Sequence, residues 1–181
     1  RPAAAAARKN DLESFLGGFE NVPAQPSVRP PEHTADDTKM KLADALFGDA
    51  PAPTRATGAA GHEICGLLTG AEAGRARHDL TIANRATRAA DRFQMDIGQQ
   101  IEAFRATRRA GHVIVAIYHS HPVGEAVPSA HDRRGHGYPA IPAIIVAPGA
   151  DADVIRAWWL QPSSAAECPL IIEPAERTAF L

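Results

Sequence analysis

The stretch Tyr118-His119-Ser120-His121-Pro122 places two histidines two residues apart, directly after the apolar, β-branched run 113–117. Such a run is typical of a buried strand. Because side chains alternate between the two faces of a strand, we expect His119 and His121 to project from the same face. Two imidazoles on one face can bind one metal ion. Asp132 follows eleven residues after His121, so a loop has room to return and supply a third ligand.

Two histidines and one carboxylate leave the fourth position of a tetrahedral zinc ion open, which is a feature of catalytic rather than structural zinc. The segment Ser129-Ala130-His131-Asp132 also matches a capping box, with Ser129 at the N-cap of a helix and an acid three residues later. The two roles are compatible, because a capped first turn would hold Asp132 in place.

A second stretch strengthens the zinc hypothesis, because a lone acid, Glu63, opens an otherwise apolar segment, 64–68. With Glu63 upstream, the chain contains His119-Ser120-His121-Pro122 and then Ser129-x-x-Asp132, with the seven residues 122–128 between His121 and Ser129. This pattern resembles the JAMM (MPN+) family of Mov34/JAB-type zinc isopeptidases, and the resemblance covers residues 57–174.

The resemblance implies a role for each motif residue. One Zn²⁺ per chain would be bound by His119, His121 and Asp132. Glu63 would act as the general base, and Ser129 would donate a hydrogen bond to the oxyanion of the tetrahedral intermediate. Ser120 lies between the two histidines, so its side chain should point to the opposite face of the strand and serve packing or supporting hydrogen bonds.

The activity implied by the resemblance is that of a zinc metalloprotease that hydrolyses the amide bond after the C-terminal Gly-Gly of a ubiquitin-like or sulfur-carrier protein. The short segment between Asp132 and Ile141 resembles bacterial members that process sulfur-carrier proteins more than eukaryotic deubiquitinases. The bond cleaved, peptide or lysine isopeptide, stays open. A homodimer and a partnership with a ubiquitin-like activating or conjugating system are both compatible with the resemblance.

Other functions are kept as alternatives. A non-catalytic MPN scaffold and a JAMM peptidase of the phage-tail type share the fold that the resemblance implies. A serine nucleophile is not favoured, because the chain has no Gly-x-Ser-x-Gly elbow. A zinc deaminase is not favoured either, since the Pro-Cys-x-x-Cys half of that site is absent. The histidines near the motif, outside the ligand set, are expected on the surface: His62, His112, His131 and His136.

Composition narrows the partners and the compartment. The formal net charge of the 181 residues is -2, which gives no basic field for nucleic acid. Two cysteines, Cys65 and Cys168, make no disulfide framework and fit a reducing, cytoplasmic setting. Cys65 lies in an apolar segment and is expected to be a small core residue. No apolar run is long enough for a membrane helix.

We expect a mixed α/β fold in three parts: an N-terminal extension (1–56), a zinc protease domain (57–174) and a tail (175–181). The extension is Pro- and Ala-rich, with one amphipathic helix beginning near Asn10 and another over 37–47. The domain should be a curved mixed sheet flanked by helices, which the resemblance likens to cytidine deaminases. A helix capped by Asp96 and stopped by Gly111 should bury Ile97, Ile101 and Phe104. Strands are predicted at 63–68, 80–83, 92–96, 112–121, 141–146, 154–160 and 170–172.

Overall fold

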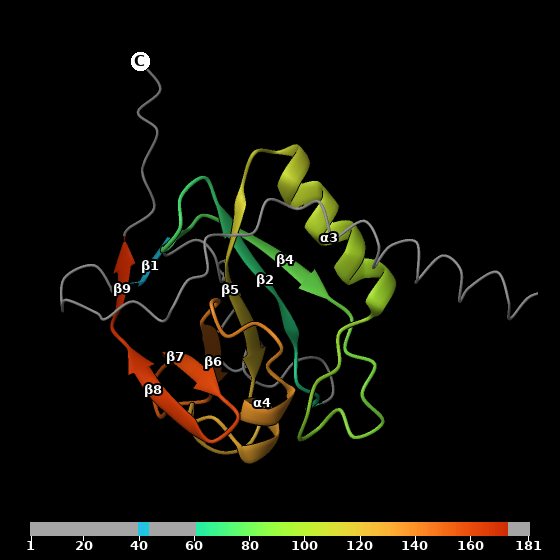
Figure 1. Cartoon of the computed structure of the whole chain (residues 1–181). Helices are drawn as coiled ribbons and strands as arrows, with labels where there is room; N and C mark the ends of the chain where they lie inside the picture. Colours follow the sequence, from blue (N-terminus) through green and yellow to red (C-terminus); the bar gives the residue numbers. More distant parts are fainter. Residues whose placement is uncertain (1–39, 44–60, 174–181) are drawn as a thin grey trace, which may run out of the picture. The chain divides into compact units, whose positions relative to one another are not determined.

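The computed structural model of the chain describes residues 40–43 and 61–173. A six-stranded mixed sheet, in the order β4-β2-β5-β6-β7-β8, forms its centre (Figure 1). Within this sheet, β5 and β6 pair in parallel, and all other neighbouring strands pair antiparallel. The mixed α/β fold predicted from the sequence is confirmed. The strands are β2 (Cys65–Gly70), β4 (His78–Ile82), β5 (Val113–Ser120), β6 (Ala143–Ala147), β7 (Val154–Gln161) and β8 (Ser164–Cys168).

Helix α3 (Ile97–Arg109) begins and ends as the sequence predicts. The Asp96 side chain accepts a hydrogen bond from the backbone N–H of Gln99, and Gly111 follows the helix with a φ of 70°, a left-handed conformation that favours glycine. The expected apolar stripe is wrong at one end, because Ile97 is 61% exposed whereas Thr107 is buried.

A second, smaller sheet contains the first described segment. Strand β1 (Met40–Ala43) pairs in parallel with β3 (Arg75–Ala76) on one side and with β9 (Leu170–Glu173) on the other. The helix predicted over 37–47 is therefore wrong at these residues. Alternation explains the difference, because Met40 and Leu42 both point into the core while Lys41 between them is half-buried.

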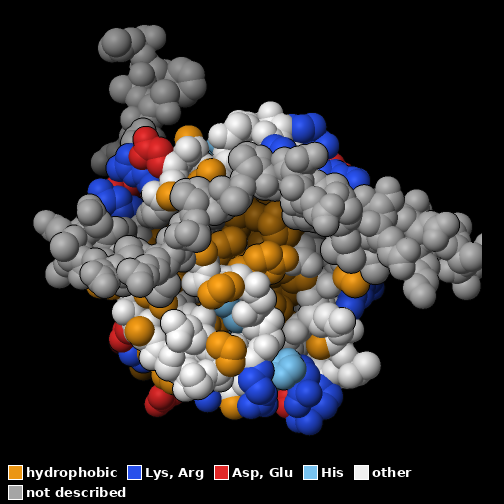
Figure 2. Space-filling view, viewed as in Figure 1, with side chains coloured by type: hydrophobic (Ala, Val, Ile, Leu, Met, Phe, Trp, Pro, Cys, Tyr) orange, Lys and Arg blue, Asp and Glu red, His pale blue; other side chains and the backbone are white. Residues whose placement is uncertain are grey.

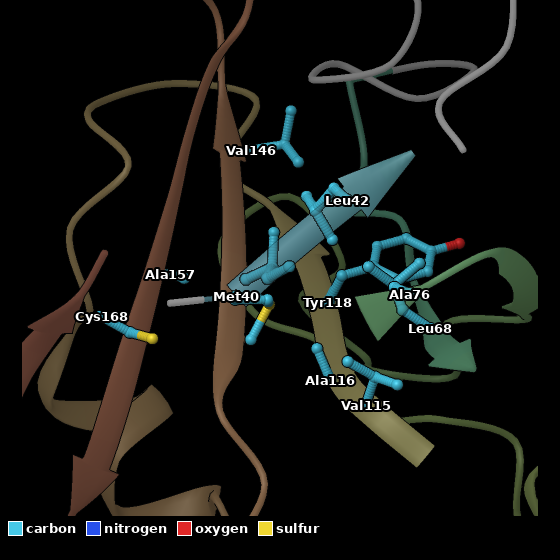
Figure 3. Packing of buried hydrophobic residues seen from close by; sticks show 11 residues of the cluster. Met40, Leu42, Leu68, Ala76, Val115, Ala116, Tyr118, Val146, Ala157 and Cys168 are labelled. Atoms are coloured by element: carbon cyan, nitrogen blue, oxygen red, sulfur yellow. The ribbon is translucent and has the colours of Figure 1, made fainter. Parts of the chain in front are cut away.

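The central sheet has apolar side chains on both faces. On one face, Met40 and Leu42 of β1 pack against Tyr118 of β5 and Val146 of β6 (Figure 3). On the other face, Leu67 and Ile117 belong to a cluster that contacts Phe104 of α3. Strand β5 is thus buried on both sides, which is why its sequence is continuously apolar rather than alternating.

Other expected elements differ in detail. Residues 92–96 do not form a ladder, and Asn84 and Met95 make only an isolated bridge. Glu63 lies two residues before β2 begins. Strands β3 and β8 were not predicted, because neither Arg-Ala nor Ser-Ala-Ala-Glu-Cys carries an apolar pattern. The helix predicted near Asn10 and the domain boundaries at 56/57 and 174/175 lie outside the described residues. In the described part of the chain, no helix combines the length and apolar character needed to cross a membrane.

Candidate metal centre

Three potential ligands meet where β5 ends. His119 is near the end of β5, His121 follows the strand, and Asp132 is in the first turn of α4 (Ala130–Gly135). The Nε2 atoms of the two histidines are 3.2 Å apart. His119 Nε2 is 3.4 Å from Asp132 Oδ1, and His121 Nε2 is 3.5 Å from Asp132 Oδ2. The residues that the sequence proposed as metal ligands are therefore brought together.

The distances within this cluster suit a zinc ion. Nitrogen and oxygen ligands bind zinc at about 2.0–2.2 Å, and in tetrahedral geometry two such ligand atoms lie about 3.3–3.6 Å apart. The Nε2–Nε2 separation of 3.2 Å is close to such an edge, and each Nε2 lies 3.4 or 3.5 Å from a different oxygen of Asp132. The donor set, two imidazoles and one carboxylate, also suits zinc. The residues present fit the ion, and their number leaves one position of a tetrahedron unfilled.

His121 is oriented by the loop that follows it. Its backbone N–H donates to the carbonyl of Val146 on β6 (2.8 Å), and its Nδ1 is 2.8 Å from the backbone carbonyl oxygen of Glu125. A carbonyl only accepts, so Nδ1 carries a proton, and Nε2 is the ring atom on the side of the cluster. Gly124, with a φ of 114°, allows the turn that brings Glu125 back to the ring.

His119 is held by packing rather than by hydrogen bonds to its second nitrogen. Its ring stacks on Phe93, with centroids 4.6 Å apart. Its Nδ1 is buried without a hydrogen-bond partner in the described residues. Sequence reasoning missed Phe93, because nothing local marks a single aromatic side chain in a polar segment as a neighbour of His119.

Asp132 is fixed by the predicted capping box. Its backbone N–H donates to Ser129 Oγ (3.1 Å), and its Oδ2 accepts from the backbone N–H of Ser129 (2.6 Å). The carboxylate therefore faces the histidines because the helix cap requires that orientation. The Ser129 hydroxyl is thereby held next to Asp132, in the same turn.

The three side chains affect each other's protonation. Burial works to raise the pKa of Asp132, but hydrogen bonds from His119 and His121 hold that pKa well below its usual range. Complete burial lowers the pKa of His119. His121 is also desolvated, yet its bonds to Asp132 and to the Glu125 carbonyl raise its pKa. An ionised carboxylate beside a neutral His119 is the protonation state that metal ligands need.

Glu63 is a buried acid, only 4% exposed. Burial raises the pKa of its carboxyl from 4.5 to about 7, with His121 acting to lower it and Asp132 to raise it. These opposing influences show that Glu63 shares the electrostatic environment of the cluster. Its Oε2 makes no hydrogen bond within the described residues. A carboxyl with a pKa near neutrality is suited to proton transfer.

Ser120 points away from the cluster, as predicted. Its Oγ accepts a hydrogen bond from the backbone N–H of Ile64 (3.0 Å), and its own backbone N–H donates to the carbonyl of Ile64 (3.0 Å). Ser120, between the two histidines at the end of β5, thereby connects that strand to the residue after Glu63. Cys65 is fully buried and its thiol donates to the carbonyl of Ile82 (3.4 Å), which fits the expected core role.

The remaining histidines near the motif stay outside the cluster. His62 and His131 are exposed, while His112 and His136 are half-buried. His112 stacks on His78 with ring centroids 5.0 Å apart, and His136 Nε2 donates to the carbonyl of Ile141 (2.7 Å). The view in Figure 2 shows histidine side chains below a central hollow in which hydrophobic side chains gather.

Comparison with known proteins identifies a family and several relatives that this chain resembles. The profile of the Prok-JAB family, described as prokaryotic homologs of the JAB domain, matches residues 53–161. A CysO-cysteine peptidase of Mycobacterium tuberculosis is 39% identical over 73 residues, 40% of this chain and 49% of that protein. A desampylase of Haloferax volcanii is 34% identical over 108 residues, 58% of this chain and 69% of that protein. The chain thus spans about half the length of the mycobacterial relative.

Solved structures show the same fold. The solution structure of a protein from Desulfitobacterium hafniense superimposes with a TM-score of 0.66 and 24% identity, covering 78% of this chain and 99% of that one. A protein from Salinibacter ruber gives a TM-score of 0.51 at 24% identity, covering 78% of this chain and 95% of that one.

Proposed function

Because the chain belongs to the Prok-JAB family, we propose that it is a zinc-dependent peptidase acting after the C-terminal Gly-Gly of a ubiquitin-like or sulfur-carrier protein. The observation that carries this proposal is the cluster of His119, His121 and Asp132, whose spacing fits zinc, in one electrostatic environment with the buried acid Glu63. The relatives named CysO-cysteine peptidase and desampylase support the class of substrate.

The metal would be held by His119, His121 and Asp132. A zinc ion held there would lower the pKa of a bound water toward neutrality and so make hydroxide available. The two histidine rings are already oriented for it, one by the Glu125 carbonyl and one by the Phe93 ring. Asp132 is held ionised by its hydrogen bonds, so the ligand set needs little rearrangement.

Glu63 is proposed to move the proton. Its carboxyl, with a pKa of about 7, can take a proton from the attacking water and give it to the leaving amine. A group whose pKa is close to the working pH serves well in both directions, and such transfer contributes roughly 10²- to 10⁴-fold in rate. In this proposal Glu63 binds no metal.

Ser129 is proposed to stabilise the oxyanion. Its Oγ accepts from the backbone N–H of Asp132, which uses a lone pair of the oxygen and leaves the O–H hydrogen to donate elsewhere. A donor of this kind is worth about 10²- to 10³-fold in kcat. The helix cap thus fixes the position of the hydroxyl.

The test is cleavage of defined substrates. Purified protein with zinc is incubated with ubiquitin-like sulfur-carrier proteins extended after Gly-Gly by either a peptide or an isopeptide-linked lysine, and the products are weighed by mass spectrometry. We expect a product that ends in Gly-Gly. Glu63→Gln should lose at least about 10²-fold in kcat while retaining zinc, and the exposed control Glu102→Gln should keep full activity. Binding of these substrates without cleavage would overturn the proposal in favour of a scaffold.

A further inference from the structure

The backbone of Glu63 is held from outside the sheet. Glu63 lies before β2 begins, so no regular ladder fixes its peptide groups. Its N–H donates to the carbonyl of Ala89 (2.6 Å), and its carbonyl accepts from Asn84 Nδ2 (2.9 Å). Both partners lie in the segment 84–95, which we call the anchoring loop. The position of Glu63 therefore depends on this loop.

Asn84 organises the anchoring loop through all of its amide hydrogen-bonding capacity. Its Nδ2 donates to the carbonyls of Glu63 (2.9 Å) and Arg92 (3.1 Å). Its Oδ1 accepts from the backbone N–H groups of Ala86 and Gln94, both at 3.0 Å. Two donated and two accepted bonds saturate an asparagine side chain. One side chain thus joins both arms of the loop to the backbone of Glu63.

Asn84 is itself tied to regular structure. It follows β4 and forms a bridge with Met95. Next to this bridge, the Ala83 carbonyl accepts from the backbone N–H of Asp96, the residue that caps α3. On the other side of Glu63, the backbone of Ile64 is bonded to Ser120. Asn84 and Ser120 therefore hold Glu63 from two sides: Asn84 from the connection between β4 and α3, and Ser120 from the end of β5.

This arrangement matters because the carboxylate itself is weakly tied. Glu63 Oε2 makes no hydrogen bond in the described part of the chain, so the placement of the side chain depends on its backbone and on packing. A general base must come within about 2.6–3.2 Å of the group that it deprotonates. A misplacement of about 1 Å can cost 10²-fold in rate.

We propose that Asn84 is a positioning residue for Glu63, acting through the hydrogen bond from its Nδ2 to the Glu63 carbonyl. The inference rests on the proposed function, in which Glu63 is the general base. It differs from a purely structural role, in which Asn84 would only close the anchoring loop. If Asn84 only closed the loop, its loss would affect stability and every step of the reaction. If it positions Glu63, its loss affects the step that needs Glu63.

Asn84→Asp is the informative variant. It keeps the oxygen that accepts from Ala86 and Gln94, and so keeps two of the bonds that close the loop, but it loses the donor to the carbonyls of Glu63 and Arg92. Gln99→Ala is the matched control, because Gln99 Oε1 also accepts a backbone hydrogen bond, from Ala83 (2.8 Å), next to Asn84. No hydrogen bond joins Gln99 to Glu63 in the described residues, so this variant reports the effect of losing an amide staple alone.

We expect Asn84→Asp to lower kcat by about 10- to 100-fold with KM within about twofold and zinc content unchanged, while Gln99→Ala keeps wild-type kcat. In the Glu63→Gln background, Asn84→Asp should cause no further loss, because the residue it positions is already disabled. A loss of equal size in that background, or wild-type kcat in Asn84→Asp, would overturn the proposal.

A second readout uses the metal-free protein and needs no substrate. Amide hydrogen exchange of Glu63 should be faster in Asn84→Asp than in the wild type and unchanged in Gln99→Ala. Unchanged exchange in Asn84→Asp would overturn the anchoring role. An inactive zinc-loaded wild type, or a fully active Glu63→Gln, would instead contradict the proposed function, so the two failures are distinguishable.

Discussion

Ser120 and Ile64 are joined by two hydrogen bonds, each 3.0 Å long, that connect the end of β5 to the residue after Glu63. One bond is between backbone groups, and the other uses the Ser120 hydroxyl as the acceptor. The hydroxyl thus continues the pairing of β2 and β5 beyond the point where β2 begins. The Ile64 side chain has no oxygen, so removal of the Ser120 hydroxyl leaves the Ile64 N–H without its side-chain acceptor.

We predict that Ser120→Ala destabilises the protein by about 1–3 kcal/mol, the cost of leaving a buried donor unpaired. Urea unfolding measures the change. Ser164→Ala is the matched control, because the Ser164 hydroxyl is on the surface and bonds only weakly, to Gln161 (3.4 Å), and should change stability by less than about 0.5 kcal/mol. Equal unfolding midpoints for Ser120→Ala and the wild type would refute this role.

The raised pKa of Glu63 predicts a pH-dependent stability difference. In the folded state its pKa is about 7 rather than 4.5, so folding favours the protonated form. This contribution to stability is fully present below about pH 4.5 and is lost as the pH rises through 7. Glu63→Gln removes the ionisation. In metal-free protein, we expect the free energy of unfolding of the variant to rise relative to that of the wild type by up to about 3 kcal/mol between pH 5 and pH 8.

Denaturant unfolding at several pH values, in the presence of a chelator, measures that difference. Glu102→Gln serves as the control, because Glu102 is exposed and its pKa is lowered by Arg109. The free energy of unfolding of this variant should not rise relative to that of the wild type over this pH range. A constant gap between Glu63→Gln and the wild type from pH 5 to pH 8 would mean that burial does not hold the carboxyl protonated.

Gly66 makes room for the aromatic residue beside His119. A Cβ at Gly66 would lie 2.6 Å from both Cε1 and Oη of Tyr118 and would also meet the Leu80 carbonyl oxygen. We predict that Gly66→Ala destabilises the fold by about 1–3 kcal/mol through overpacking. Gly98→Ala, in α3, has no such clash and should stabilise by up to about 1 kcal/mol. Thermal unfolding compares them, and a neutral Gly66→Ala would contradict the packing argument.

The sheet that contains β1 depends on Glu173. Its carboxylate is bonded to Arg75 at two positions (3.0 Å each) and lies 3.3 Å from Lys41 Nζ and 3.5 Å from Arg77. Arg75 and then Lys41 lower the pKa of Glu173 to about 2. Stability from these ion pairs is present above about pH 4.5 and is lost as the pH falls toward 2.

We therefore expect Glu173→Gln to lower the melting temperature at pH 7, with the difference shrinking as the pH approaches 2. Thermal unfolding at pH 7 and at pH 3 tests this. Glu167→Gln, which removes one exposed pair with Arg156, should have the smaller effect at pH 7. A Glu173→Gln deficit that is as large at pH 3 as at pH 7 would show that the charge is not responsible.

The parts of the fold that could be predicted from the sequence are those with local causes. Alternation along one strand brings His119 and His121 to the same face, and a four-residue capping box orients Asp132. Strand β1 could not be predicted in the same way, because its partners β3 and β9 are distant in sequence and its four residues also suit a helix. The role of Asn84 was missed for a similar reason, since its bonds go to backbone groups that leave no trace in side-chain pattern.

The measurement that tests the central claim most directly is the zinc content of the purified protein, determined by elemental analysis after zinc is added and the excess removed. We predict about one zinc per chain in the wild type, none in His121→Ala, and about one in His112→Ala, which changes a histidine outside the cluster. A wild type that retains no zinc, or a His121→Ala variant that retains a full equivalent, would contradict the account.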